Sequence, residues 1–336
     1  MVRIAINGFG RMGRLFLRAV AGRKGLEVVV VNEPKGDPET LALLLEFDST
    51  QGRWDRSCRA EQGALLAGEQ RIALVQQDAW DALPWREHGV ELVVDCSGRV
   101  KAKDKLEPHF RNGARKVLVS NPVPGVPNLV YGVNHASCDF ANEPVVTAAS
   151  CTTNCLAPIV RVLHDAIGIE RGLVTTIHDP TNTQSVVDRP DKDPRRARSA
   201  LTNLIPTSTN SATAVALIVP ELRGRLDSIA VRAPVLNASI TDCSFQVARA
   251  TSVEEVNAVL AAAAAAGPLQ GILGHETRPL VSSDFARDPR SAVVDALSTR
   301  VVDGRMVKVL AWYDNEWGYV NRMADLASAI GAVVRS

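Results

Sequence analysis

The chain has 336 residues, of which 46% are hydrophobic and 22% are charged, and its formal net charge is +1. These values are typical of a soluble globular enzyme that is long enough for two domains, each with its own core. Because the charge is almost balanced, the chain has no general attraction to nucleic acid or to an anionic membrane, and we expect neither as a partner.

The six cysteines are scattered through the chain, unlike those of a small secreted scaffold, which favours free thiols in a reducing compartment. Val2 to Ile6 is already strand-like, so we expect no secretory signal, and no apolar run reaches membrane-spanning length. No Cys or His pair at zinc-finger spacing accompanies Cys151 and Cys155, so no metal site is expected. These observations predict a cytoplasmic protein.

A glycine-rich turn follows this first strand. The run Gly8-Phe9-Gly10-Arg11-Met12-Gly13 has GxGxxG spacing and opens a helix, and a second strand, Val28 to Val31, ends at Asn32-Glu33. The glycines let the backbone approach a pyrophosphate, the helix start binds it, and the Glu33 carboxylate takes the ribose hydroxyls. A turn without a ligand is the alternative, but the complete pattern favours a dinucleotide. Because Glu33 repels a ribose 2′-phosphate, NAD is expected rather than NADP.

Two later strands, Leu92 to Asp95 and Lys116 to Val119, run into Ser97 and Ser120. In a doubly wound sheet the carboxyl ends of the strands meet at the edge where ligands bind. We therefore expect both serines near the cofactor.

A cysteine stands at the next junction between a strand and a helix. Pro144 to Ala149 reads as a strand and Asn154 to Ile167 as a helix, so Cys151 lies at the helix start between hydroxyl side chains. Unpaired N–H groups and the helix dipole lower the pKa of a thiol there. A buried, inert cysteine is the more common case, but the polar neighbours favour a nucleophile. Cys155, one turn later, is expected to pack inward.

A candidate base follows this helix, because the strand-like run Gly172 to His178 ends in an imidazole. A cysteine nucleophile is activated by an imidazole within hydrogen-bond reach, although a structural histidine at a strand end is the alternative. The remaining histidines are expected to face solvent: His88, His109, His135, His164 and His275.

A charged, proline-broken segment, Asp188 to Arg198, is typical of a functional loop, and a solvated surface loop is its alternative. Hydroxyl groups in Pro206 to Ser211, together with Arg232, are candidate donors to a phosphorylated substrate.

Along essentially its whole length the chain resembles the glyceraldehyde-3-phosphate dehydrogenase family. Four motifs carry the resemblance: Ala5-Ile6-Asn7-Gly8-Phe9-Gly10-Arg11, Ala149-Ser150-Cys151-Thr152-Thr153-Asn154-Cys155, Arg195-Arg196-Ala197-Arg198 and Trp312-Tyr313-Asp314-Asn315-Glu316-Trp317-Gly318-Tyr319. The resemblance implies an α/β protein with a doubly wound Rossmann NAD-binding domain over residues 1–150, an α+β catalytic domain over 151–318, and a C-terminal helix over 319–336 that returns to the first domain. It also implies a homotetramer.

By this resemblance Cys151 and His178 are the catalytic residues, and the substrates are glyceraldehyde 3-phosphate and inorganic phosphate. Cys151 attacks the aldehyde, His178 takes the hydroxyl proton as hydride leaves, and phosphate then releases the thioester as 1,3-bisphosphoglycerate. The expected cofactor-binding residues are Gly8, Phe9, Gly10, Arg11, Met12, Gly13, Glu33, Ser97, Ser120, Asn315 and Tyr319. The expected residues for the substrate phosphate and the attacking oxyanion are Ser150, Thr152, Thr181, Thr183, Arg196, Thr209, Asn210 and Arg232.

Two of the anion-site residues depart from the family pattern, which commonly has an acid where Thr183 stands and a glycine where Asn210 stands. At the cofactor site Glu33 replaces the family's usual aspartate with the same charge, so NAD is still expected. The segments around Thr183 and Asn210 are similar to variants found beside arsenic-resistance genes. We therefore hold as a hypothesis that arsenate replaces phosphate and gives 1-arseno-3-phosphoglycerate. The alternatives are erythrose-4-phosphate dehydrogenase and a non-catalytic regulatory protein that binds nucleotides or RNA.

Overall fold

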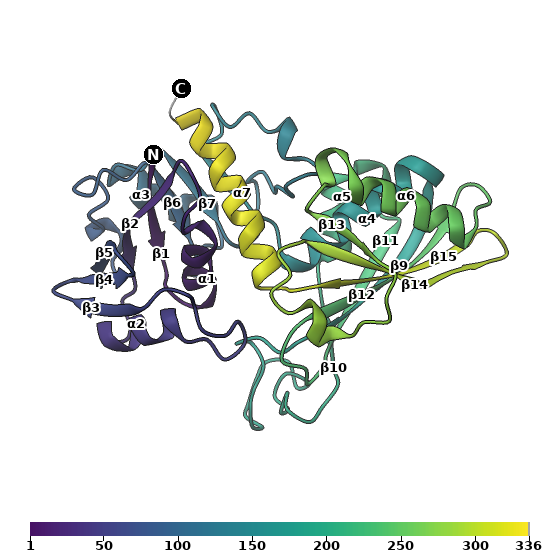
Figure 1. Cartoon of the computed structure of the whole chain (residues 1–336), viewed down its shortest axis with the longest axis horizontal. Coiled ribbons are helices and arrows are strands. Elements are labelled where there is room, and N and C mark those ends of the chain that lie inside the picture. Colours follow the sequence, from purple (N-terminus) through teal and green to yellow (C-terminus); the bar gives the residue numbers. More distant parts are fainter. Residues whose placement is uncertain (335–336) are drawn as a thin grey trace. The chain divides into compact units, whose positions relative to one another are not determined.

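The computed structural model describes residues 1–334 of the chain. Its contacts divide into two compact units: one holds residues 1–150 with the C-terminal segment from Val320, and the other holds Cys151–Tyr319. Each unit is built on its own sheet, as Figure 1 shows. None of the helices in residues 1–334 has the combination of length and apolar character that a membrane span requires.

The first unit holds an eight-stranded sheet, within the described residues, in the order β3-β4-β5-β2-β1-β6-β7-β8. The strands from β5 to β8 in this order are parallel, and the order reverses between β1 and β6. Ligands of doubly wound folds bind at such a reversal, beyond the carboxyl ends of the strands. The strands are β1 (Val2–Asn7), β2 (Leu26–Asn32), β3 (Cys58–Glu61), β4 (Ala64–Ala67), β5 (Gln70–Val75), β6 (Leu92–Asp95), β7 (Lys116–Val119) and β8 (Val145–Thr147).

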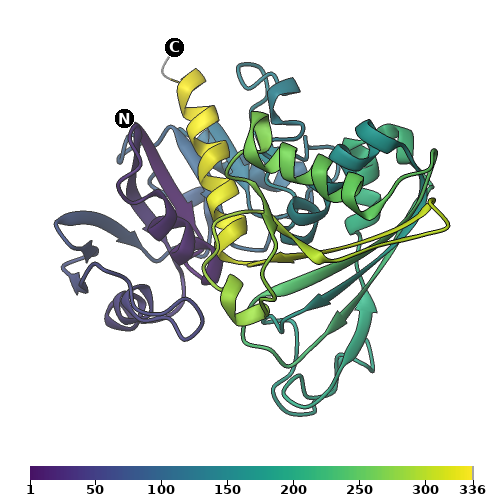
Figure 2. The ribbon, with the colours of Figure 1, turned by 45° about the vertical axis from the view of Figure 1, so that its right-hand side comes forward.

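Helix α1 of this unit begins at the glycine turn, and α2 begins at a side-chain cap. The Asp37 side chain accepts a hydrogen bond of 2.8 Å from the Thr40 N–H at the start of α2. The C-terminal helix lies beside α1 and β1 in Figures 1 and 2, and Asp325 on it pairs with Arg23 at 2.5 Å. The elements are α1 (Arg11–Val20), α2 (Pro38–Glu46), α3 (Glu107–Arg111), α7 (Trp317–Val334) and the 3₁₀ turns η1 (Trp80–Ala82), η2 (Lys103–Leu106) and η3 (His135–Ser137).

One histidine of this unit does not face solvent as expected. His109 is completely buried, and its Nδ1 accepts a hydrogen bond of 3.0 Å from the Trp85 indole. Its Nε2 lies 3.4 Å from the carboxylate of Asp95, which is also buried. The expectation was wrong because polar partners inside the core satisfy both ring nitrogens. The other four histidines predicted to face solvent are half-buried.

The second unit holds a mixed seven-stranded sheet, within the described residues, in the order β10-β11-β9-β12-β15-β14-β13. Alternate residues of β9 face opposite sides: Val174, Thr176 and His178 are buried, whereas Leu173 and Ile177 are exposed. The strands are β9 (Ile169–His178), β10 (Ile205–Ser208), β11 (Leu226–Arg232), β12 (Ser239–Val247), β13 (Leu273–Glu276), β14 (Ala292–Val302) and β15 (Met306–Tyr313).

Helices cover the buried face of this sheet, where α4 packs against α5, α6 and four of the strands. Helix α4 begins at Cys151, three residues before the predicted start at Asn154. The helical elements are α4 (Cys151–Ile167), α5 (Ser211–Ile218), α6 (Val253–Ala265) and the 3₁₀ turns η4 (Pro220–Leu222), η5 (Gly267–Leu269) and η6 (Ser282–Phe285). The expected fold class, a doubly wound α/β unit with an α+β unit, is confirmed.

Candidate active site

The turn before Cys151 has a strained backbone. Strand β8 ends at Thr147, and Ala149 then adopts a φ of 57°, in the left-handed region that costs a non-glycine residue about 1 kcal/mol. Cys151 follows as the first residue of α4, where the first N–H groups of a helix have no partner within the helix. The turn therefore places the thiol at the positive end of the helix dipole, as predicted.

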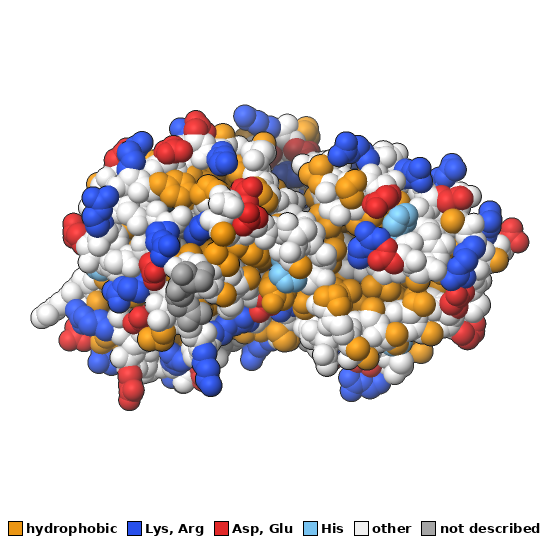
Figure 3. Space-filling model, turned by 90° about the horizontal axis from the view of Figure 1, so that it is seen from above, with side chains coloured by type: hydrophobic (Ala, Val, Ile, Leu, Met, Phe, Trp, Pro, Cys, Tyr) orange, Lys and Arg blue, Asp and Glu red, His pale blue; other side chains and the backbone are white. Residues whose placement is uncertain are grey.

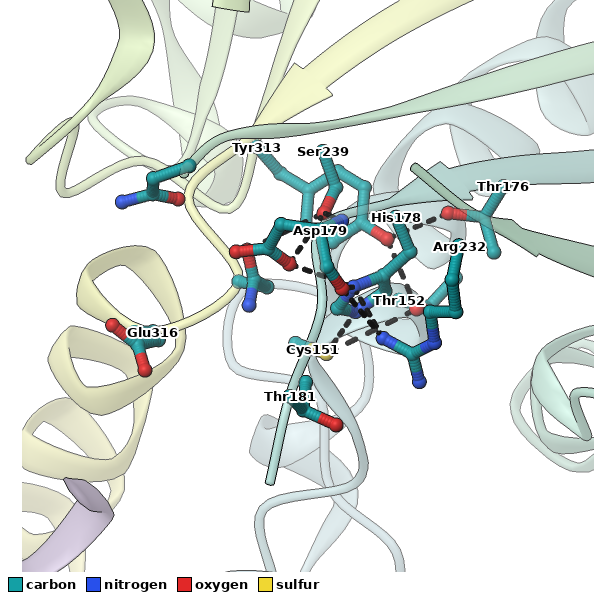
Figure 4. A network of polar contacts seen from close by, with 12 residues as sticks. Cys151, Thr152, Thr176, His178, Asp179, Thr181, Arg232, Ser239, Tyr313 and Glu316 are labelled. Atoms are coloured by element: carbon teal, nitrogen blue, oxygen red, sulfur yellow. Dashed lines mark hydrogen bonds and ion pairs between the residues drawn. The ribbon is translucent and has the colours of Figure 1, made fainter. Parts of the chain in front are cut away.

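His178 is the last residue of β9, and its Nε2 lies 3.6 Å from the Cys151 Sγ (Figure 4). Burial alone raises the pKa of Cys151, but the hydrogen bond and charge of His178 outweigh it, so this pKa lies below its usual value. Burial lowers the pKa of His178, while the hydrogen bonds that its ring donates to Asp179 and Cys151 raise it to about 9. The pair therefore favours a thiolate beside an imidazolium.

The second thiol of α4 has the opposite character. Cys155 is completely buried, and its Sγ lies 3.7 Å from the Thr241 hydroxyl. Burial raises the pKa of Cys155 to about 12, so it remains a neutral thiol. No group of three or more His, Cys, Asp or Glu side chains within residues 1–334 is arranged to hold a metal ion.

A tyrosine that the sequence reasoning did not select lies behind the reactive pair. The Tyr313 hydroxyl is 3.1 Å from the Thr152 hydroxyl and 2.7 Å from the Thr176 hydroxyl (Figure 4). Its ring meets the His178 ring edge-on, with centroids 6.0 Å apart. The hydroxyl of Thr152, an expected oxyanion ligand, is thus held in place by Tyr313 at the end of β15. Tyr313 belongs to the Trp312–Tyr319 motif, so the signal was present in the sequence.

Arg232, at the end of β11, lies on the other side of the imidazole. One guanidinium nitrogen is 2.6 Å from His178 Nδ1 and donates to the Asp179 carbonyl at 2.9 Å. Burial lowers the pKa of Arg232, and the nearby charge of Arg196 lowers it further. This influence of Arg196 indicates that two of the predicted anion ligands lie near one another.

The remaining anion-site candidates form small hydrogen-bonded groups. The hydroxyls of Thr181 and Thr183 are 3.0 Å apart, and Gln184 contacts both. Arg196 donates to the Thr207 hydroxyl at 2.7 Å, and Thr209 contacts Ser211 at 3.3 Å. Asn210 is exposed immediately before α5, and Ser150, half-buried, immediately precedes Cys151. None of these contacts connects the cluster of Thr181, Thr183 and Gln184 with Thr209 or Arg196.

In the first unit the glycine turn has the shape that a dinucleotide requires. Gly8 has a φ of 95°, and a Cβ there would lie 2.6 Å from Ser97 Cα. A Cβ on Gly13 would lie 2.1 Å from the Gly8 carbonyl oxygen, whereas a Cβ on Gly10 would meet no atom within 4 Å. The first and third glycines therefore permit close packing, and Gly10 leaves open space before α1, where a pyrophosphate fits.

A pocket of about 320 Å³ adjoins this turn, lined by Asn7, Gly8, Asn32, Glu33, Pro34, Lys35, Asp78, Trp80, Ser97 and Arg99. The Glu33 carboxylate accepts hydrogen bonds from the backbone N–H groups of Phe9 (2.8 Å) and Lys35 (3.2 Å), so it also holds the turn in place. Ser97 donates to Asp95 at 2.7 Å. These residues fit the adenosine half of NAD.

The other expected cofactor residues are distributed over both units. The Arg11 guanidinium is paired with Asp48 at 2.7 Å, so its predicted pyrophosphate contact depends on its backbone position at the start of α1, where Met12 follows. Ser120 follows the end of β7. In the second unit, Ser239 lies 3.3 Å from the Asn315 side-chain oxygen, and Tyr319 is buried in the first turn of α7.

Comparison with known proteins agrees with both halves of this description. Residues 2–103 match the family model of the glyceraldehyde 3-phosphate dehydrogenase NAD binding domain, and residues 150–315 match that of the C-terminal domain. The match of the first segment confirms NAD as the cofactor.

Three relatives cover nearly the whole chain, and all carry the same enzyme name. The chain is 54% identical to glyceraldehyde-3-phosphate dehydrogenase 3 of Nostoc sp. over 334 residues, which is 98% of each chain. It is 49% identical to the glyceraldehyde-3-phosphate dehydrogenase of Cereibacter sphaeroides, covering 99% of each, and 46% identical to glyceraldehyde-3-phosphate dehydrogenase 1 of Bacillus cereus, covering 98% of each. At this identity and coverage the chain belongs to the glyceraldehyde-3-phosphate dehydrogenase family.

Proposed function

We propose that this NAD-dependent enzyme oxidises glyceraldehyde 3-phosphate to 1,3-bisphosphoglycerate through an acyl group carried on Cys151. The observation that carries the proposal is the 3.6 Å contact between Cys151 Sγ and His178 Nε2 at the start of α4. A thiolate at this position is a strong nucleophile toward an aldehyde, and the thioester it forms conserves the energy of the oxidation.

The proposed chemistry uses the same pair in each step. The Cys151 thiolate attacks the aldehyde carbon, and the new oxyanion takes the proton of the His178 imidazolium, which gives a thiohemiacetal. His178 takes this proton back as hydride leaves the carbon, and a thioester remains. When bound, NAD supplies the hydride acceptor. An inorganic oxyanion then attacks the thioester carbonyl, the acyl phosphate leaves, and the thiolate is regenerated.

Donors around the pair support the proposed anion sites. We assign Thr181, Thr183, Arg196 and Arg232 to the substrate phosphate, and Ser150, Thr152, Thr209 and Arg232 to the attacking oxyanion. The close approach of Arg232 to the catalytic imidazole, at 2.6 Å, supports its place in both sets, because a guanidinium binds phosphate oxygens through several N–H groups.

Arsenate is a second candidate for the attacking oxyanion. It has nearly the shape of phosphate, so the same residues and steps apply to it. Two residues favour this candidate because they differ from the family pattern: Thr183, in a neutral group with Thr181 and Gln184, and Asn210, whose amide is exposed before α5. Erythrose 4-phosphate remains the alternative aldehyde.

Steady-state kinetics test the proposal directly. We expect NADH production from glyceraldehyde 3-phosphate to depend on added phosphate or arsenate. Because the Glu33 and Asp78 carboxylates line the pocket, we expect NAD to exceed NADP in kcat/KM by at least about tenfold, which is about 1.4 kcal/mol. Erythrose 4-phosphate, measured in parallel, should react more slowly. A strong preference for phosphate would contradict the arsenate role, and no oxyanion dependence would contradict the phosphorylating reaction.

A homotetramer is proposed because one face of the second sheet carries large apolar side chains that the chain leaves in solvent. On this face Leu173 of β9 is 68% exposed and Ile229 of β11 is 55% exposed, and Leu236, in the loop after β11, is 68% exposed. Apolar surface of this kind usually marks a protein interface. We expect light scattering to give four times the mass of one chain, and Leu173→Glu to lower this mass. A wild-type monomer would contradict the proposal.

The proposed location is the cytoplasm. We propose neither nucleic acid nor a membrane as a partner of this enzyme. All six cysteines are free thiols, which supports a reducing compartment. On the face shown in Figure 3, positive and negative side chains are interspersed, so this face has no broad basic area that would attract nucleic acid.

A further inference from the structure

A buried carboxylate lies on the side of His178 opposite Cys151. Asp179 Oδ1 is 2.7 Å from His178 Nδ1, and both side chains are about 95% buried. Figure 4 shows the three side chains in sequence, with the thiol and the carboxylate on the two ring nitrogens of one imidazole.

Strand β12 fixes the position of Asp179. The Ser239 hydroxyl donates to Asp179 Oδ1 at 3.2 Å and accepts from the Asp179 N–H at 3.3 Å. Ser239 is itself 1% exposed and is the first residue of β12. The carboxylate is therefore supported from a neighbouring strand, as is typical of groups that orient an imidazole.

The position of Arg232 makes a negative charge necessary here. Its guanidinium nitrogen, 2.6 Å from His178 Nδ1, can only donate, whereas Nδ1 of an imidazolium also carries a proton. Two cations at this distance in a buried site repel each other strongly. The Asp179 carboxylate accepts a hydrogen bond from the Nδ1–H group, for which the Asp179 backbone carbonyl at 2.8 Å is a second acceptor, and of these two acceptors the carboxylate alone supplies the compensating charge. Without it, Arg232 would donate to Nδ1 and favour the neutral ring.

We propose that Asp179 is a positioning residue that directs the Nε2 side of His178 toward Cys151 and keeps the pair in its thiolate–imidazolium form. The proposal rests on the proposed roles of Cys151 and His178. The proton moves from Cys151 Sγ to His178 Nε2, and the Nδ1 proton stays on the ring.

The direction of the pH effect follows from the groups that face the ring. These are Cys151 on α4, Arg232 on β11, Tyr313 on β15 and Asp179 itself. With the carboxylate present, the pKa of His178 is about 9, so the ring stays protonated up to about that pH. Without the negative charge of Asp179, the positive charge of Arg232 lowers the pKa of His178. The ion pair of the Cys151 thiolate and the His178 imidazolium is then lost at a lower pH than in the wild type.

The test compares Asp179→Asn, which keeps a side-chain oxygen acceptor without the charge, with Asp179→Ala, which removes both from the side chain. The backbone carbonyl of residue 179, 2.8 Å from His178 Nδ1, is present in both variants. Asp242→Asn is the matched control, because Asp242 pairs with Lys308 at 2.7 Å on the same sheet and has no contact with His178. The rate of Cys151 alkylation by iodoacetamide and the thiolate absorbance near 240 nm are measured from pH 5 to pH 10 in the full-length protein. The reaction of Cys151→Ser is subtracted.

For Asp179→Asn we expect alkylation at neutral pH to slow by about tenfold and to recover only at a pH about one unit higher, because less of the thiol is held as thiolate beside the imidazolium. Asp179→Ala should lose at least as much, and Asp242→Asn should follow the wild type. Profiles of both Asp179 variants that coincide with the wild type, while circular dichroism shows them folded, would overturn the proposal. Because alkylation needs neither substrate nor NAD, this result is independent of whether the wild type oxidises glyceraldehyde 3-phosphate.

Discussion

Cys151→Ser is expected to reduce NADH production from glyceraldehyde 3-phosphate by at least about 10³-fold. A serine hydroxyl at the start of α4 is not ionised near neutral pH, so the variant lacks the thiolate that attacks the aldehyde. The glycine turn and the pocket at Glu33 lie in the other compact unit, so NAD binding should be retained. Steady-state rates and a calorimetric titration with NAD measure the two effects.

The matched control is Cys155→Ser, in the same helix. Cys155 has a pKa of about 12 and its Sγ lies 3.7 Å from the Thr241 hydroxyl, so activity should be preserved. In the wild type, acid quenching in the absence of oxyanion should leave the acyl group on the peptide that contains Cys151. An active Cys151→Ser variant, or an acyl group on another thiol, would refute the assignment of the nucleophile.

Local patterns predicted the elements that position the site. Gly8 and Gly13 were identified from spacing alone, and the structure shows why each must be glycine, since a Cβ would meet the backbone. The strand that ends at His178 and the helix start near Cys151 also follow from periodicity and polarity, which depend on residues close in sequence. The predicted helix start was three residues late because Cys151, Thr152 and Thr153 have only moderate helix propensity, and packing decided the outcome.

Contacts between distant residues could not be predicted in this way. Asp179 follows His178 directly in the sequence, yet its role depends on Ser239 and Arg232, which arrive on two other strands. Tyr313 reaches Thr152 across 161 residues of chain. His109 was expected in solvent because nothing near it in the sequence reveals Trp85 and Asp95 as its partners. Such side chains acquire their function from strand order, which local patterns do not encode.

His178→Asn should lower kcat by about 10² to 10⁴-fold, because the variant has no group that exchanges a proton with the thiohemiacetal oxygen. It should also change the thiol. Burial alone raises the pKa of Cys151, and the contacts that overcome this come first from His178. Without them the pKa of Cys151 rises, so alkylation at neutral pH slows and recovers only as the pH increases. Measuring kcat and the iodoacetamide rate from pH 6 to pH 10 separates the two effects.

The control for this substitution is His275→Asn, which changes a half-buried imidazole of β13 in the same unit. It should leave both pH profiles unchanged. The Asp179 variants provide an intermediate case, since they keep the imidazole but weaken its positive charge. If His178→Asn kept kcat within threefold of the wild type, the base would have to be another group. If it lost kcat but kept the alkylation profile, His178 would act on the substrate alone, and the low pKa of Cys151 would then have to come from the N-terminus of α4.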